Sequence, residues 1–251
     1  MSVEPPCPGL FVTGTDTGVG KTMVTAALAA FFRGCGLKVG VMKPCETGVD
    51  DPQQPGADAR LLRWAAGSND ADDLIAPYRF REPLAPALAA ERAGTIIDPN
   101  RIVEAYATLS RGKDLVLVEG AGGLMVPVRG GYLVADLARQ LALPLLVVAR
   151  PSLGTLNHTL LTVFAARAME LPLAGFLINR MPQHPDVAER EAPHLLASLA
   201  SADLLGVLPE VTGTGEAMVE QLAAALAAQP TLPWLVHAAG LPRRVLSGPA
   251  V

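Results

Sequence analysis

The stretch from Gly14 to Thr22 reads GTDTGVGKT and lies between an apolar run, residues 10–13, and a segment rich in alanine. A glycine-rich loop between a strand and a helix turns its backbone N–H groups inward and cradles phosphate at the helix N-terminus. Lys21 can reach the terminal phosphates, and the Thr22 hydroxyl suits Mg²⁺. The usual phosphate-loop pattern has a glycine six positions before the lysine. In this chain that position is Thr15, and the glycine is one residue earlier, at Gly14. The sequence therefore predicts an enlarged phosphate-binding loop.

Composition restricts the class of protein. The chain has 251 residues, of which 50% are hydrophobic and 18% are charged, and its net charge is -4. This balance supports a sizeable folded core and argues against disorder. A slightly acidic chain offers no electrostatic attraction for nucleic acid, so we expect small-molecule partners and no nucleic acid.

The cysteines and the apolar runs indicate a compartment. Cys7, Cys35 and Cys45 are odd in number and show no CxxC spacing, which argues against a disulfide framework or a zinc site. The N-terminal MSVEPPCPG lacks the features of a signal peptide. The apolar run at residues 141–149 contains Pro144 and is too short to span a bilayer. We therefore expect a reduced, cytoplasmic protein with no membrane partner.

Short apolar runs alternate with longer helix-like segments along the chain. The predicted strands are residues 10–13, 39–42, 115–118, 145–149, 174–178 and 204–208. The predicted helices are residues 22–32, 101–110, 156–169, 188–200 and 216–228. Continuous apolar runs are typical of strands buried on both faces. The alternation predicts an α/β fold, a mostly parallel sheet flanked by helices on both faces, as in P-loop NTPases.

The remaining segments contain many residues that break regular structure. Residues 49–100 are rich in proline, aspartate and glycine, and we expect loops and short helices outside the sheet. The tail from about residue 229 carries Pro230, Pro233, Pro242 and Pro249, which exclude a long helix there. No internal repeat or linker is visible, so we predict a single domain over residues 1–251.

Two charged residues follow predicted strands, at the edge of a parallel sheet where ligands bind. Lys43 follows the run 39–42 and is either a group that neutralises a transferring phosphoryl or an exposed strand-end lysine. Glu119 follows the run 115–118 in VEGAGG, where phosphate-loop enzymes commonly carry an acid associated with Mg²⁺. The alternative for Glu119 is an acid in a glycine-rich surface turn.

Three further residues are open to two interpretations from their pattern alone. Asp58 in GADAR fits a helix N-cap or first turn, and the spacing favours that structural role. Thr155 in LGTLNH either caps a helix or marks free N–H groups that hold a carboxylate. His158 lies in an apolar helix pattern, which favours packing over catalysis.

Taken together, five motifs resemble one family. The chain reads GTDTGVGKT, KPCETG, VEGAGG, LGTLNHTLLT and INR in an order and spacing similar to those of the dethiobiotin synthetases, from about residue 10 to about residue 210. The enlarged loop is usual in that family. The resemblance implies an ATP-dependent ligase of biotin biosynthesis that converts diaminopelargonate and CO₂ to dethiobiotin, with release of ADP and phosphate.

The resemblance also implies roles for individual residues. The nucleotide-binding set comprises Thr17, Gly18, Val19, Gly20, Lys21, Thr22, Asn179, Leu208, Pro209 and Glu210. Mg²⁺ would be organised by Thr22, Asp58 and Glu119. The catalytic residues would be Lys21, Lys43 and Thr17. Some members carry an acid where this chain has Gly18.

The same resemblance implies a substrate site that two subunits share. The substrate-binding set comprises Lys43, Thr47, Gly154, Thr155 and Asn157. In the family, the group around residues 154–157 binds the substrate carboxylate across a subunit interface. The implied assembly is therefore a homodimer.

Other functions of the same fold are weighed against this one. Regulatory ATPases of partition and cell division carry a signature lysine five positions before the loop lysine, where this chain has Asp16. Amide-forming synthases of the cobalamin pathway add a glutamine-hydrolysing domain for which this chain has no room. A small-molecule kinase differs only in what attacks the phosphate, and the residues alone leave that alternative open.

Overall fold

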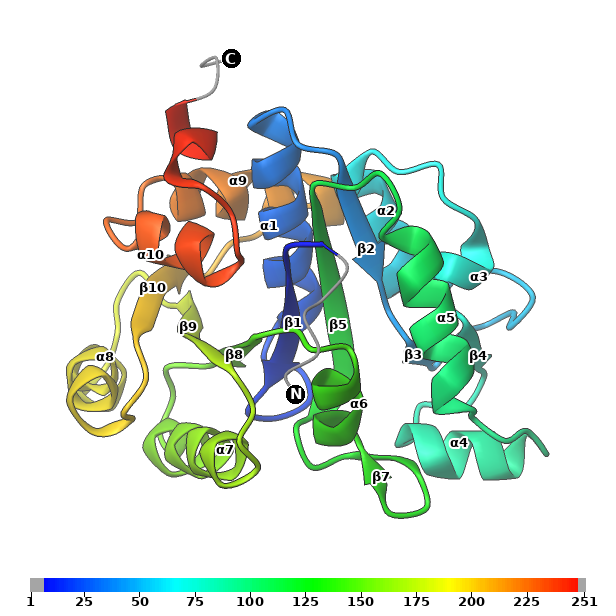
Figure 1. The fold of residues 1–251 in the computed structure, drawn as a ribbon. Helices are drawn as coiled ribbons and strands as arrows, with labels where there is room; N and C mark the ends of the chain where they lie inside the picture. The colour runs from blue at the N-terminus through cyan, green and yellow to red at the C-terminus, as the bar shows by residue number, and fades with distance from the viewer. Residues whose placement is uncertain (1–6, 248–251) are drawn as a thin grey trace.

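The computed structural model describes residues 7–247 and contains a six-stranded sheet in the order β10-β9-β8-β1-β5-β2, with every pair of neighbouring strands parallel (Figure 1). The strands are β1 (Gly9–Gly14), β2 (Val39–Met42), β5 (Leu115–Gly123), β8 (Leu145–Ala149), β9 (Leu173–Met181) and β10 (Leu204–Pro209). Each contains one of the runs predicted as strands. The predicted α/β class is confirmed.

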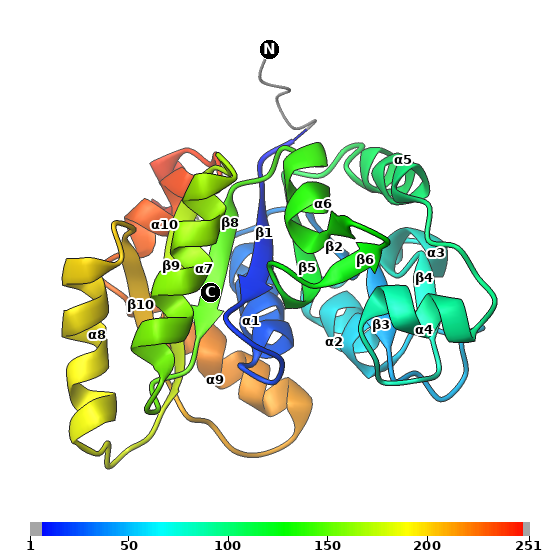
Figure 2. The ribbon, with the colours of Figure 1, turned by 90° about the horizontal axis from the view of Figure 1, so that it is seen from below.

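Helices cover both faces of this sheet (Figure 2). Side chains of α1 (Lys21–Gly34), α2 (Ala57–Ala66), α9 (Gly215–Ala227) and α10 (Leu232–Ala238) share one core cluster with one face of the sheet. The opposite face packs against α5 (Pro99–Leu109), α6 (Val134–Gln140), α7 (Thr155–Ala168) and α8 (Val187–Leu199). Leu10 and Val12 of β1 belong to the first cluster and Phe11 to the second, as alternation along a doubly buried strand requires.

The strand order places a ligand crevice at the end of β1. The chain leaves β1 toward β2 through α1, while β8 lies on the other side of β1. Crevices outside the carboxyl ends of strands at such a switch point are the usual ligand sites of open α/β sheets. The register pairs Val12 with Glu119 and Gly14 with Gly123, so the two glycine-rich segments lie side by side there.

The region of residues 49–100 contains the short helices that its composition predicts, together with one short strand that it does not predict. The helices are α2, α3 (Asp72–Ile75) and α4 (Pro86–Arg92). Here β3 (Cys45–Thr47) pairs in parallel with β4 (Tyr78–Phe80), outside the main sheet. The antiparallel pair β6 (Pro127–Arg129) and β7 (Tyr132–Leu133), with α6, was not predicted either. Strands this short carry too few residues for an alternation to be recognised.

The C-terminal part folds onto the core instead of extending from it. Up to residue 247, where the described part of the chain ends, the tail contains α10 and a 3₁₀ turn, Arg243–Ser247, and no long helix. Pro233 lies in the first turn of α10, where its missing N–H has no intrahelical partner to lose. Pro249 lies outside the described residues. Among residues 7–247 no helix has both the length and the apolar character needed to cross a membrane.

Candidate functional site

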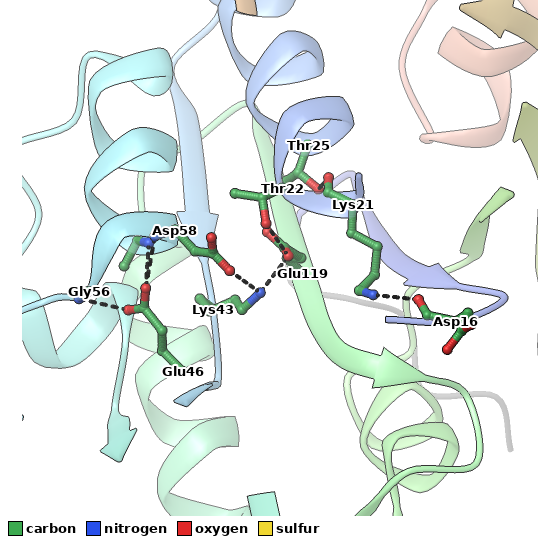
Figure 3. A network of polar contacts seen from close by, with 10 residues as sticks. Asp16, Lys21, Thr22, Thr25, Lys43, Glu46, Gly56, Asp58 and Glu119 are labelled. Atoms are coloured by element: carbon green, nitrogen blue, oxygen red, sulfur yellow. Dashed lines mark hydrogen bonds and ion pairs between the residues drawn. The ribbon is translucent and has the colours of Figure 1, made fainter. Parts of the chain in front are cut away.

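The phosphate loop runs from the end of β1 to the start of α1. Gly18 and Gly20 have φ angles of 77° and 92°, in the left-handed region that favours glycine. A Cβ atom at Gly20 would lie 2.3 Å from the side-chain nitrogen of Asn179, so this position also lacks room for a side chain. Lys21 Nζ donates to the Asp16 carbonyl at 3.0 Å, which folds the lysine back across the loop (Figure 3). The cationic group therefore lies over the concave side of the loop.

Glu119 follows the apolar residues 115–118 of β5 and contacts the end of the phosphate loop. The Thr22 hydroxyl donates to Glu119 Oε1 at 2.8 Å, although the two residues are far apart in sequence. Glu119 is fully buried, and its second oxygen, Oε2, is buried without a hydrogen-bond partner among the described residues. A buried carboxylate oxygen without a partner is costly, which points to a cation or donor as its natural ligand.

Lys43 lies between two carboxylates that come from different elements. Its Nζ is 2.5 Å from Glu119 Oε1 and 2.9 Å from Asp58 Oδ2. Lys43 follows β2, Asp58 is in the first turn of α2, and Glu119 is on β5, and Figure 3 shows the three side chains converging. The Lys43 side chain is only 7% exposed, whereas that of Asp58 is 43% exposed and faces the cleft. The interpretation of Lys43 as an exposed strand-end lysine is therefore wrong.

Burial and the neighbouring charges shift the pKa values of the ionisable groups in this cluster. Burial lowers the pKa of Lys43, but the carboxylates of Glu119 and Asp58 outweigh that effect and the net pKa is raised, so the lysine stays cationic. Burial raises the pKa of Glu119, with Lys43 opposing the shift. Burial acts on Asp58 in the same direction, but Lys43 outweighs it and the net pKa is lowered. For Lys21, burial lowers the pKa, with Glu119 opposing.

A cleft of about 750 Å³ opens above these groups. Its lining contains nine of the residues expected from the sequence: Thr17, Gly18, Gly20, Lys21, Thr22, Lys43, Thr47, Asp58 and Glu119. Val19 is in the loop but is 1% exposed and packs into the core behind it. The structure thus gathers the expected phosphate, metal and reacting-centre residues in one place.

Comparison with known proteins shows which family this chain belongs to. A family model described as an AAA domain matches residues 8–217. The ATP-dependent dethiobiotin synthetase BioD of Thermodesulfovibrio yellowstonii is 44% identical over 81% of this chain and 89% of its own length. Proteins of the same name from Bacillus subtilis and Bacillus cereus are 38% and 42% identical, over 81% and 82% of this chain and 87% and 84% of their own lengths. The chain belongs to the dethiobiotin synthetase family.

Solved structures extend the likeness of this dethiobiotin synthetase family member to a wider fold group. The septum site-determining protein MinD of Pyrococcus horikoshii, solved with Mg-ADP, aligns with a TM-score of 0.56 at 18% identity, over 93% of this chain and 94% of its own. A MinD cell division protein from Aquifex aeolicus aligns with a TM-score of 0.54 at 16% identity, over 98% and 99%. At such identities the likeness concerns the fold alone.

The base-side residues expected from the dethiobiotin synthetase resemblance do not line the cleft itself. Asn179 is 2% exposed, and its side-chain nitrogen donates to the Val19 carbonyl at 3.1 Å. Its Oδ1 is buried without a partner among the described residues. Leu208 is buried in the core, Pro209 ends β10 beside β9, and Glu210 follows it, its N–H donating to the Met181 carbonyl at 2.8 Å. These residues lie beside the loop, on the β9–β10 side of the sheet, whereas Lys43 lies on its β2 side.

The substrate residues expected on α7 are also absent from the lining of the cleft. Gly154 has a φ of 95° and precedes the first turn of α7. The Thr155 hydroxyl is buried, 3.4 Å from that of Thr159, whereas Asn157 is exposed. His158 is partly buried and outside the cleft lining. Within this chain, α7 therefore supplies no residue to the cleft.

The structure adds residues that the sequence did not indicate. Arg180 has a left-handed φ of 64°, and its guanidinium donates to the Gly18 carbonyl at 2.8 Å, which braces the loop. Residues 83–86 form one wall of the cleft, and no pattern in the sequence marks them. Cys45 also lines the cleft, and burial raises the pKa of its thiol to about 12, with Lys43 opposing, so the group is uncharged. Glu46 was visible in KPCETG but had no assigned role.

Proposed function

We propose that this chain closes a ureido ring: it joins diaminopelargonate to CO₂ with cleavage of ATP and forms dethiobiotin, ADP and phosphate. The observation that carries the proposal is the placement of Lys21 and Lys43 in one cleft with the Thr22–Glu119 pair. The names of relatives at 38–44% identity support the same reaction.

The residues present fit Mg²⁺. Thr22, Asp58 and Glu119 supply only oxygen donors, which hard cations prefer, and the buried Oε2 of Glu119 has no partner among the described residues. The described residues hold no cluster of three or more His, Cys, Asp or Glu. That suits Mg²⁺, which is usually bound by one or two carboxylates together with substrate phosphates and water. When bound, the ion neutralises charge on the nucleotide phosphates.

The reaction, as proposed, needs two bond-forming steps after CO₂ capture. One amine of the substrate adds to CO₂ and loses a proton, which leaves a carbamate. A carbamate oxygen attacks the γ-phosphorus, and the bond to ADP breaks. The second amine then attacks the carbonyl carbon of this mixed anhydride and expels phosphate as the ring closes.

The chain's contribution to these steps is mainly position and charge. Lys21 and Lys43 approach the transferring phosphoryl from two sides of the cleft, where cationic groups stabilise the charge of the transition state. Thr17 and Thr47 line the same cleft and would orient the phosphate and the diamine. No nucleophilic side chain is needed, because the substrate supplies both attacking atoms.

The nucleotide base is proposed to lie beside the loop. Asn179 has a buried acceptor, Oδ1, that matches an exocyclic amine such as that of adenine. The backbone of residues 208–210, at the end of the neighbouring strand β10 and just after it, would complete that side.

The substrate carboxylate is proposed to bind at α7 of a second copy of the chain. The first turn of α7 offers backbone N–H groups that no side chain caps, next to Thr155 and the exposed Asn157. Leu161 and Phe164 follow Asn157 at helical spacing and are 57% and 69% exposed, a large apolar surface for an isolated subunit. A homodimer covering this stripe would bring the helix start of one protomer toward the cleft of its partner.

The proposal is tested by ADP release from Mg-ATP with bicarbonate, with and without diaminopelargonate. We expect release to require the diamine. Lys43→Ala should reduce kcat about 10²- to 10³-fold, the usual cost of losing one group that stabilises a transition state. Lys113→Ala is the matched control. Lys113 Nζ also forms an ion pair, 2.7 Å from Asp70 Oδ2, but neither residue lines the cleft.

Near-normal kcat in Lys43→Ala would show that this lysine has no transition-state role. ADP release that ignores the diamine would refute the ligase itself. Circular dichroism of both variants establishes that a lost rate does not reflect lost folding.

A further inference from the structure

Glu46 is a buried carboxylate behind the cleft. It lies on β3, is 3% exposed and forms no ion pair among the described residues. Instead it accepts three backbone hydrogen bonds from the start of α2. Oε2 accepts from Gly56 N at 2.9 Å, and Oε1 accepts from Asp58 N at 2.9 Å and Ala59 N at 3.2 Å (Figure 3).

These contacts supply a cap that α2 does not have. The N-cap residue is Gly56, which has no side chain to accept the free N–H groups of the first turn. Glu46, from another element, takes the amides of the N-cap, the second and the third helical positions. Its negative charge also complements the positive end of the helix dipole.

Gly56 and Glu46 fit as a pair. A Cβ atom at Gly56 would lie 2.4 Å from Glu46 Oε1 and 2.5 Å from its Cδ. The glycine thus lets the carboxylate approach the backbone closely enough to hold it. The contact fixes where α2 begins, and with it the position of Asp58.

Asp58 has a different contact on each side. Its backbone N–H is held by Glu46, while its side-chain Oδ2 accepts from Lys43 Nζ at 2.9 Å. We propose that Glu46 is a positioning residue, which anchors the start of α2 so that the Asp58 carboxylate faces Lys43 and would be available to hold Mg²⁺. The inference rests on the proposed metal role of Asp58 and assigns Glu46 no contact with substrate.

The test measures how much Mg²⁺ tightens ADP binding, which needs neither diaminopelargonate nor turnover. Titration calorimetry gives the Kd of ADP once in EDTA and once in Mg²⁺. The first Kd divided by the second is the ratio compared between variants, and a larger ratio means that Mg²⁺ tightens binding more. The variants are Glu46→Ala, the isosteric Glu46→Gln, Asp58→Ala and the double variant Glu46→Ala/Asp58→Ala. The control is Asp186→Asn, since Asp186 caps α8 by accepting from Glu189 N at 2.8 Å, away from the cleft.

We expect Glu46→Ala to lower the ratio about tenfold, as loss of a group that orients a metal ligand does. Hydrogen exchange should accelerate at the amides of residues 56, 58 and 59. Glu46→Gln keeps one accepting oxygen and should show a smaller loss of the same kind. Asp186→Asn should leave the ratio unchanged. The double variant should be no worse than Asp58→Ala, because Glu46 acts through Asp58.

Several results would overturn the inference. One is a wild-type Kd ratio in both Glu46 variants. Another is a fall of the ratio in Asp186→Asn as large as that in Glu46→Ala. The third is a double variant whose loss equals the sum of the two single losses. If Glu46→Ala does not fold, Glu46→Gln decides by the same ratio and exchange. Failure of Asp58→Ala to change the ratio would refute the proposed metal role. A normal ratio in the Glu46 variants beside a loss in Asp58→Ala would refute only the positioning role.

Discussion

Lys43 forms ion pairs with both Asp58 and Glu119. The motifs predicted each of these residues, because lysines and acids that follow buried strands gather at one edge of a parallel sheet. Their mutual contacts were not predictable, since Asp58 comes from a helix outside that sheet whose start depends on Glu46. Local spacing favoured an N-cap or first-turn aspartate for Asp58, and Asp58 does lie in the first turn of α2, while Glu46 accepts the N–H groups at the helix start.

At the level of single residues, two glycines of the loop make a matched pair. Gly20→Ala combines a left-handed φ of 92° with a clash on Asn179, whereas Gly18→Ala has a φ of 77° and no atom within 4 Å of the new Cβ. We expect Gly20→Ala to weaken ADP binding by at least about tenfold more than Gly18→Ala, or about 1.4 kcal/mol, measured by calorimetry. Equal losses would mean that backbone strain alone, not the packing of Asn179, governs the loop.

At the level of elements, the main sheet was predictable and its attachments were not. β2 and β8 have the predicted bounds, because their residues are buried on both faces and form continuous apolar runs. β3, β4, β6 and β7 have two or three residues each. β3 pairs with β4 from about thirty residues further along the chain, and β6 pairs with β7 across a tight turn. The cleft wall at residues 83–86 belongs to the same unpredicted region.

Close packing within the main sheet gives an element-scale prediction. A Cβ at Gly9 would lie 2.4 Å from the Val116 carbonyl of β5 and 2.8 Å from Leu143. Gly9→Ala should therefore lower the free energy of unfolding by about 3 kcal/mol, the upper end for ordinary substitutions. Gly131→Ala, in the β6–β7 turn with no atom within 4 Å, should cost less than about 0.5 kcal/mol. Urea unfolding compares them, and equal losses would contradict this packing.

At the scale of the whole molecule, the fold alone does not indicate the function. MinD proteins share the fold at 16–18% identity, but this chain has Asp16 where the regulatory ATPases carry their signature lysine. Fold likeness at that level does not transfer an activity. The family motifs and the composition of the cleft therefore carry the functional argument.

The proposed dimer gives a prediction at this scale. Phe164→Glu places a charge on the apolar stripe of α7, where Phe164 is 69% exposed, and should convert the dimer to monomers in light scattering. Diamine-dependent ADP release should fall while ADP affinity stays unchanged, because the nucleotide site lies within one protomer. Val187→Glu on α8, where Val187 is 73% exposed, is the control and should remain dimeric. A monomeric wild-type protein with full activity would contradict the shared site.

The central claim is the identity of the bond that forms, and the mass of the organic product tests it most directly. The protein is incubated with Mg-ATP, diaminopelargonate and ¹³C-labelled bicarbonate, and the product is weighed by mass spectrometry against ADP released. We expect the product to have the mass of the diamine plus one labelled carbonyl, less two hydrogens, with one product molecule for each ADP released. A product heavier by a phosphoryl group and free of label would identify the protein as a kinase and refute ring closure.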